Sequence, residues 1–375
     1  MTLIKKNIHP KIILYELNEV PKKLIDKYVE LRPKSTFAYL IKNGEFIETI
    51  NTDKGELHPW STWPTLHRGV NNDKHGINFI NQNIKQSNNN YPPIWDILQR
   101  NGINVGIFGS LQSYPPIYSE NVLFHLPDTF APSPEAHPKI LMDFQSFNLN
   151  ICAENKAISG KINDSLYLKF LNLILSRVFT LSSSLKVFSH VLKEKIYSKY
   201  YLRRSLMQPI LSFDLFLRSV KNYEPLFSTY FTNHVAGIIH RYWRDFFPEE
   251  FNSENYLVNK FNRISVIKAM DIADKQLESL LYLSKKNNYN LLIASSMGQK
   301  GREDIPSSYD LLLNDLNLFL KFFELDEKNI VELPAMQPDI CLECITKENL
   351  MHIQNSISKI LDLEENQIII ERYNA

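Results

Sequence analysis

The stretch HPWSTWPTLHRGVNNDKHG, residues 58–76, is the densest group of polar and reactive side chains in this chain. It holds three hydroxyl side chains, three histidines, one arginine and two glycines. Its hydroxyls lie beside tryptophan and proline, which stiffen the backbone. A hydroxyl at the N-terminus of a helix would face backbone N–H groups that bind phosphate or sulfate. The stretch therefore predicts an anion-binding pocket, and the alternative is a loop whose tryptophans and prolines only pack.

On both sides of this stretch, short apolar runs of strand length alternate with helical patterns. Strands are predicted at residues 11–17, 103–108, 227–232 and 291–294, and helices at 22–43, 94–100 and 265–284. This alternation is typical of a mainly parallel sheet with helices on both faces. Ligands of such sheets bind beyond the carboxyl ends of the strands. That rule selects four residues that follow predicted strands: Asn18, Asn233, His234 and Ser296.

The pattern changes between residues 163 and 220, where leucines, aromatic residues and lysines recur at helical spacing without a strand signal. We interpret residues 151–222 as a helical insertion. It separates an N-terminal part, residues 1–150, from a C-terminal part, residues 223–375, of one α/β core. Residues 193–204 carry five basic side chains among tyrosines. Two interpretations stay open for this insertion: a helical cap with a solvated basic face, or a peripheral contact with an anionic membrane surface.

Composition limits the class of protein. Of the 375 residues, 44% are hydrophobic and 22% charged, as in a globular protein with a sizeable core. The formal net charge of +1 gives no sign of a nucleic-acid partner. Three cysteines are too few for a disulfide framework, and we interpret the C-x-x-C of Cys341 and Cys344 as small residues on a strand. Without a signal peptide or a long apolar span, we expect a cytoplasmic protein, or one peripheral to the inner membrane.

Residues 58–76 resemble the nucleophile region of the alkaline phosphatase superfamily, in the branch of type I phosphodiesterases and nucleotide pyrophosphatases. The tripeptide TWP at residues 62–64 matches the Thr-aromatic-Pro of that branch. Gly69 and the His-Gly at residues 75–76 match its later Gly and closing His-Gly, at a slightly shorter spacing. Two later stretches are similar in order and content: residues 92–116 and 126–134. The resemblance implies an alkaline-phosphatase-like three-layer sandwich, with Thr62 as the catalytic nucleophile.

The same resemblance implies two metal ions, whose Asp and His ligands the family takes from four places in the chain. Asn18 stands where the first Asp is expected, and residues 231–243, FTNHVAGIIHRYW, offer no Asp for the second place. Ser296 and Met297 stand in place of an Asp-His pair, and residues 333–344 lack the late His. Serine is a poor ligand and methionine a soft one. We therefore expect a degenerate metal site and no full two-metal centre.

A single zinc, manganese or magnesium ion stays an alternative. Its ligands would come from Glu16 or Glu19 together with Asn233, His234 and His240. Asn18 and Ser296 are the other two candidate metal ligands. Glu16 and Asn18 are two residues apart, so on a strand their side chains point to the same side. Without a metal, the pocket would still bind an anion, with His240 as general base. The candidate substrate-binding residues are Ser61, His67, Arg68, His75, Asn233, His234 and Arg241.

Three hypotheses of function follow. The first is a hydrolase or transferase that acts on phosphoric or sulfuric esters, with a small anionic or glycan substrate and a place in surface polysaccharide metabolism. The second is a metal-free member of the superfamily that binds a phosphorylated or sulfated ligand without turning it over. The third is a glycan transferase that reuses the same pocket, with His240 or Glu16 as the base.

Overall fold

The computed structural model describes residues 10–80, 82–153, 179–251, 256–301, 313, 315–325, 327–333 and 340–358. The chain divides into two compact units. Unit 1 holds Met1–Phe79 and Ile84–Glu303, and unit 2 holds Ile80–Asn83 and Asp304–Ala375. The predicted C-terminal part, residues 223–375, therefore runs through both units.

Unit 1 is built on a five-stranded sheet in which every pairing is parallel, with the strand order β3-β2-β4-β1-β5. Its strands are β1 (Lys11–Leu17), β2 (Val105–Phe108), β3 (Val122–Leu126), β4 (Phe227–Thr232) and β5 (Tyr289–Ala294). In β1, Tyr15 lies opposite Tyr230 of β4 and Ile293 of β5. The predicted α/β class and parallel sheet are confirmed, while β3 is a strand that the sequence analysis missed.

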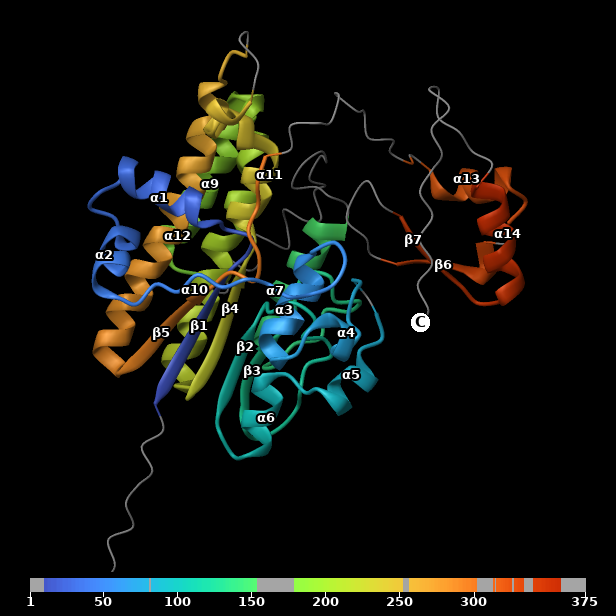
Figure 1. Ribbon diagram of the computed structural model, residues 1–375, viewed down its shortest axis with the longest axis horizontal. Coiled ribbons are helices and arrows are strands. Elements are labelled where there is room, and N and C mark those ends of the chain that lie inside the picture. Colours follow the sequence, from blue (N-terminus) through green and yellow to red (C-terminus); the bar gives the residue numbers. More distant parts are fainter. Residues whose placement is uncertain are drawn as a thin grey trace, which may run out of the picture. The chain divides into compact units, whose positions relative to one another are not determined.

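Helices cover both faces of this sheet (Figure 1). They are α1 (Lys22–Leu31), α2 (Thr36–Asn43), α3 (Pro59–Arg68), α4 (Asn72–His75), α5 (Lys85–Asn90), α6 (Ile94–Arg100), α7 (Ile140–Ala153), α9 (Leu181–Ile196), α10 (Gln208–Tyr223), α11 (His234–Phe246) and α12 (Lys260–Asn287), with 3₁₀ helices η1 (Ser198–Leu206) and η2 (Pro248–Glu250). Alternate residues of β1 enter different cores. Ile13 and Tyr15 join the cluster of α10 and α12, while Leu14 joins Trp95 of α6. This arrangement is compatible with a three-layer sandwich.

The helix predicted over residues 22–43 is two helices. α1 ends at Leu31, and α2 begins after Ser35, whose hydroxyl accepts the N–H of Ala38 at 3.2 Å. Pro33 lies between them. It has no N–H to donate and disfavours helical backbone at the residue before it, so the helix stops there.

The described part of the predicted insertion is helical and consists of α9, η1 and α10, while residues 154–178 lie outside the described residues. α10 packs directly on the sheet. Phe213 and Phe216 lie with their ring centroids 5.3 and 4.8 Å from that of Tyr230 in β4. The α10 part of the insertion therefore belongs to the layer of helices that packs on the sheet. In the described part of the chain, no helix has the length and apolar character needed to cross a membrane.

Unit 2 contains a two-stranded antiparallel sheet of β6 (Ile330–Leu333) and β7 (Cys341–Cys344). Its helices are α13 (Leu316–Phe322), η3 (Glu327–Asn329) and α14 (Lys347–Ile357). A small core of its own joins these elements through Leu320, Leu325, Ile330 and Ile353. The two cysteines of the C-x-x-C begin and end β7 as free thiols, in agreement with the prediction that they lie on a strand.

Candidate functional site

The candidate site lies where the carboxyl ends of three neighbouring strands meet α3. Asn18 follows β1, Asn233 follows β4 and Ser296 lies two residues beyond β5. The backbone N–H of Asn18 donates to the carbonyl of Thr232 at 3.1 Å, which ties the first two strand ends together. In Figure 1, α11 continues from the upper end of β4. Parallel pairing thus brings together residues that are far apart in the sequence.

The side-chain amide of Asn18 is the centre of the site. Its Oδ1 accepts the indole N–H of Trp63 at 2.7 Å, and its Nδ2 donates to Asn233 Oδ1 at 2.7 Å and to Glu19 Oε1 at 3.0 Å. Asn18 is only 1% exposed. One buried amide therefore joins β1, α3 and the end of β4. An aspartate has no N–H and could not make the last two bonds.

The carboxylate of Glu19 is held on several sides and orients His240. Glu19 Oε2 accepts from Gln299 Nε2 at 2.6 Å and lies 2.9 Å from His240 Nε2. Burial alone would raise the pKa of Glu19. The hydrogen bond and charge of His240, with the bonds from Gln299 and Asn18, outweigh burial, so this pKa is lowered. The Glu19 side chain is 7% exposed and that of His240 is 57% exposed. A buried anion thus positions an accessible imidazole.

Thr62 lies one turn inside α3, and its hydroxyl contacts Ser296. The two Oγ atoms are 2.8 Å apart and share a hydrogen bond, and Thr62 is 1% exposed. The N–H groups of Ser61 and Thr62 both donate to the carbonyl of His58, and Pro59, the first residue of the helix, has no N–H. These donors are therefore engaged within the helix, and the anion-binding helix terminus expected around Thr62 is not formed there.

Glu16 and His67 form a buried pair beneath the site. His67 Nε2 lies 2.7 Å from Glu16 Oε1, and both side chains are almost completely buried. The second oxygen of Glu16 has no hydrogen-bond partner among the described residues. His67 also packs against Trp63 and Trp95, with centroid distances of 5.7 and 4.7 Å. As their spacing predicted, Glu16 and Asn18 both point toward α3, but Glu16 is occupied by His67.

His75 is part of a hydrogen-bond chain that fastens the loops around α3. Its Nδ1 accepts the N–H of Ile77 at 3.0 Å, so the proton lies on Nε2, which is 2.9 Å from the hydroxyl of Thr65. That hydroxyl contacts both oxygens of Asp53, at 2.8 and 2.9 Å. Burial and the charge of Arg68 lower the pKa of His75 to about 4. His75 is therefore a neutral structural residue and supplies no positive charge to a ligand.

Like His75, Arg68 binds other residues of the protein, and Ser61 is buried among them. The Arg68 guanidinium donates to the carbonyl of Tyr91 and, at 2.8 Å, to Asn88 Oδ1. Ser61 is buried, and its hydroxyl has no hydrogen-bond partner among the described residues. Arg68 thus fastens the connection after α5.

Two predicted residues of α11 point away from Asn18. His234 Nδ1 lies 2.7 Å from the hydroxyl of Thr232, and its Nε2 lies 3.0 Å from the carbonyl of Ala269 in α12. Burial lowers the pKa of His234 to about 4, which keeps the ring neutral. Arg241 donates to the carbonyl of Gly237 one turn earlier at 3.0 Å. Helical periodicity explains this outcome, because successive residues of a helix are rotated by about 100°. His234, six residues before His240, and Arg241, the residue after it, therefore point to other sides of α11.

The donors present do not fit a metal centre. Within the described ranges, no group of three or more His, Cys, Asp or Glu side chains is placed to hold an ion. The amide oxygens of Asn18 and Asn233 already accept hydrogen bonds, and Glu16 faces His67. Glu19 and His240 remain, which is fewer than the three or four protein ligands of a zinc site. Among the described residues, the two-metal centre therefore does not find its ligands.

Sequence reasoning missed Gln299 and the anchoring role of Trp63. The signal for Trp63 was its place beside Thr62, which puts it on the α3 face that meets β1. Gln299 follows the Ser-Ser-Met-Gly stretch after β5, a loop at the correct edge of the sheet. A glutamine is not a typical metal ligand, so the expected metal chemistry does not single it out.

The comparisons with known proteins identify no relative of this chain. The resemblance to the alkaline phosphatase superfamily therefore stays a prediction, which depends on the quoted motifs. No protein-family model matches this chain, and neither does any curated protein or any solved structure.

Proposed function

We propose that the site at the strand ends carries out metal-independent acid–base chemistry on a phosphoric or sulfuric ester, with His240 as the general base. The observation that carries this proposal is the contact between Glu19 and His240, in which a buried carboxylate holds one ring nitrogen of an exposed imidazole. Such a carboxylate selects the tautomer and stabilises the imidazolium that forms when the other nitrogen accepts a proton. Nδ1 of His240 is then the atom that exchanges a proton with the ligand.

The substrate class, an anionic ester, is inferred from the resemblance of residues 58–76 to the alkaline phosphatase superfamily. The alkaline-phosphatase-like form of the fold is inferred from the same resemblance. The proximity of Thr62 to Ser296 supports it, since the same motifs predict these two positions to be neighbours. Thr62 as nucleophile stays a prediction. Attack would require its hydrogen bond with Ser296 to break and its proton to pass to a base. A glycan portion of the substrate also remains an expectation.

A second candidate function is binding of a phosphorylated or sulfated ligand without turnover. The observation that favours it is the partner of Thr62, because the hydroxyl of Ser296 neither removes a proton nor carries a charge at neutral pH. In this case His240 would bind the anion as a cation, and Thr62 would supply a hydrogen bond.

The test is an assay of the full chain with p-nitrophenyl phosphate, bis(p-nitrophenyl) phosphate and p-nitrophenyl sulfate, with and without EDTA. We expect turnover that survives EDTA and falls about 10²- to 10⁴-fold in His240→Gln, the usual contribution of a general base. His352→Gln, at an exposed histidine of α14, is the matched control and should leave turnover unchanged. Turnover that requires an added metal, or that His240→Gln leaves intact, contradicts the proposal. Phosphate binding without turnover supports the second candidate.

We infer in addition that α9 makes the peripheral membrane contact considered for the insertion. One face of α9 carries exposed apolar side chains at helical spacing: Leu181, Leu185, Phe188, Leu192 and Ile196. Exposed lysines flank this face, with Lys186 and Lys193 on one side and Lys195 on the other. Apolar residues beside lysines are what a helix needs to lie on a bilayer with anionic lipids.

A further inference from the structure

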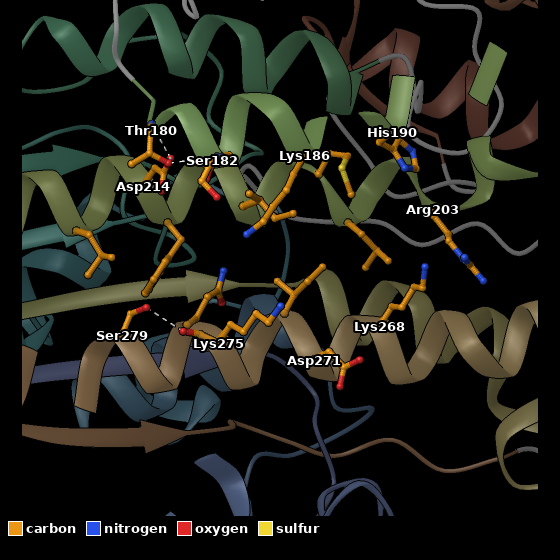
Figure 2. Close-up of a pocket in the computed structure, with 18 of the residues that line it drawn as sticks. Thr180, Ser182, Lys186, His190, Arg203, Asp214, Lys268, Asp271, Lys275 and Ser279 are labelled. Atoms are coloured by element: carbon orange, nitrogen blue, oxygen red, sulfur yellow. Dashed lines mark hydrogen bonds between the residues drawn. The ribbon is translucent and has the colours of Figure 1, made fainter. Parts of the chain in front are cut away.

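A cavity of about 470 Å³ lies among α9, η1, α10 and α12 and shares no residue with the strand-end site. Figure 2 shows its lining. Lys186 reaches from α9 toward α12, while Lys268 and Lys275 extend from α12 into the same space. The positively charged residues of the lining are Lys186, Lys193, Arg203, Lys268 and Lys275. The volume is within the range of small-molecule sites, roughly 300–1,000 Å³.

The two carboxylates that line this cavity are already engaged. Asp214 accepts the N–H and the hydroxyl of Thr180, both at 2.8 Å, at the start of α9. Asp271 accepts the hydroxyl of Tyr28 at 2.9 Å and the Nε of Arg32 at 3.2 Å, both from the neighbourhood of α1. Neither carboxylate therefore forms an ion pair with a cationic side chain of the cavity.

The cations of the cavity, in contrast, lack acidic partners. Arg203 donates to the hydroxyl of Ser265 at 2.7 Å and to the carbonyl of Phe261 at 2.8 Å, both neutral groups. Burial, followed by the charges of Arg203 and Lys193, lowers the pKa of Lys268. Four amino groups have no hydrogen bond or ion pair with any residue that the structure describes: Lys186, Lys193, Lys268 and Lys275. The five cations of the lining therefore outnumber its two carboxylates, although the charge of Asp271 acts in the opposite direction on the pKa of Lys268.

A buried imidazole and an apolar wall complete the lining. His190 is 7% exposed, and its Nε2 has no hydrogen-bond partner in the described part of the chain. Glu194 Oε2 lies 3.8 Å from it and is also bound by Arg204. Apolar side chains come from η1, α10 and α12: Leu206, Met207, Ile210, Phe213, Leu217 and Ile272. Exposed lysines and buried apolar side chains such as Leu206 and Phe213 therefore line the same cavity.

The geometry points to this cavity as a binding site for a phosphorylated amphiphile. Its phosphoryl group contacts the amino groups of Lys186 and Lys268, and its hydrocarbon chain packs against the side chains of η1 and α10. A dianion is favoured because the cations around this space outnumber its carboxylates. The apolar wall favours a chain over a free phosphate ion, since each buried methylene adds to the binding free energy. This site does not depend on the chemistry proposed for His240.

The test is calorimetric titration of the full chain with dodecyl phosphate, hexyl phosphate, inorganic phosphate and dodecanol, each as monomers in solution. We expect dodecyl phosphate to bind most tightly, with weaker binding as the chain shortens. The double variant Lys186→Gln/Lys268→Gln should weaken binding about tenfold or more, because it removes two charged hydrogen bonds. Lys285→Gln/Lys286→Gln, an equal loss of charge on α12 outside the cavity, should change nothing.

Three outcomes would overturn the inference. Inorganic phosphate that binds as tightly as dodecyl phosphate would exclude the apolar part of the ligand. Dodecanol that matches dodecyl phosphate would exclude the phosphoryl group. Binding unaffected by the double lysine variant would exclude this cavity. Vesicles of phosphatidylcholine with phosphatidic acid distinguish the sources: competition with dodecyl phosphate for the cavity supports a lipid headgroup, and absence of competition supports a soluble phosphate ester.

Discussion

At the scale of single residues, the site depends on which polar atoms donate and which accept. Asn18 is suited to its position because it accepts from Trp63 and donates to Asn233 and Glu19. The metal-binding superfamily that the motifs resemble has an aspartate at this place, where a carboxylate meets a cation. Here the neighbour is another carboxylate, and an amide is the group that joins them. The departure from the motif is therefore consistent with its surroundings.

Asn18→Asp should destabilise the fold by about 2–4 kcal/mol at neutral pH, because it removes two buried N–H donors and places a second carboxylate beside Glu19. Urea unfolding followed by tryptophan fluorescence measures this loss. Asn89→Asp, at an exposed residue of α5, is the control and should change stability by less than about 0.5 kcal/mol. Equal stability of Asn18→Asp and the wild type would show that Asn18 does not hold this network together.

The pKa of Glu19 predicts a dependence of stability on pH. Because the folded-state pKa lies below the ordinary value of 4.5, the ionised form stabilises the fold. This contribution is complete above the ordinary pKa and disappears as the pH falls through the folded value. Glu19→Gln should therefore lose less stability than the wild type between about pH 6 and pH 3. Parallel losses in the two proteins, measured by denaturation at several pH values, would contradict this assignment.

At the scale of elements, Pro33, which lies in a predicted helix, and Pro64, for which no helix was predicted, have opposite effects on helix formation. Pro33 separates α1 from α2, whereas Pro64 lies inside α3 without ending it. The difference comes from tertiary contacts. Trp63 donates to Asn18 before Pro64, and His67 contacts Glu16 after it, so β1 holds α3 on both sides of the proline. The sequence shows where the prolines are. It does not show at which of them tertiary contacts compensate for the lost helical hydrogen bond.

The apolar face of α9 gives a prediction about membranes. Leu185→Glu/Phe188→Glu should abolish co-sedimentation with phosphatidylglycerol vesicles, because both side chains are 58% exposed and would lose their apolar contact with the bilayer. The unfolding temperature should hardly change. Tyr282→Glu, at a position of α12 that is 68% exposed, is the control. Vesicle binding that survives the double substitution would exclude this face as the contact.

At the scale of the whole molecule, the two units differ in the size of their cores. The clusters on the two faces of the sheet contain most of the buried hydrophobic residues, while unit 2 depends on a few: Leu320, Leu325, Ile330 and Ile353. The sequence analysis placed residues 223–375 in one core, because apolar periodicity indicates that a segment packs but not which partner it packs against.

Leu320→Ala should destabilise unit 2 by about 2–5 kcal/mol, as large-to-small core substitutions do. Unit 1 should be unaffected, and the chain offers a direct way to observe this. All four tryptophans lie in unit 1, at positions 60, 63, 95 and 243. Tryptophan fluorescence should keep its unfolding midpoint while calorimetry shows a lower first transition. A fluorescence midpoint that falls with the calorimetric one would show that the two units unfold together.

The sequence by itself determined the strands β1 and β4, the helix α6 and the edge of the sheet where polar residues gather. These follow from local patterns, since apolar runs of strand length and polar residues after them depend on near neighbours. The tertiary structure alone decided that His240 faces Glu19 while His234 and Arg241 turn away, and that His75 and Arg68 are structural. It also created the basic cavity of α9 and α12, whose residues lie far apart in the sequence. The physical reason is that hydrogen-bond partners and burial are set by packing across the sheet, where a one-residue step along α11 changes the surroundings of a side chain completely.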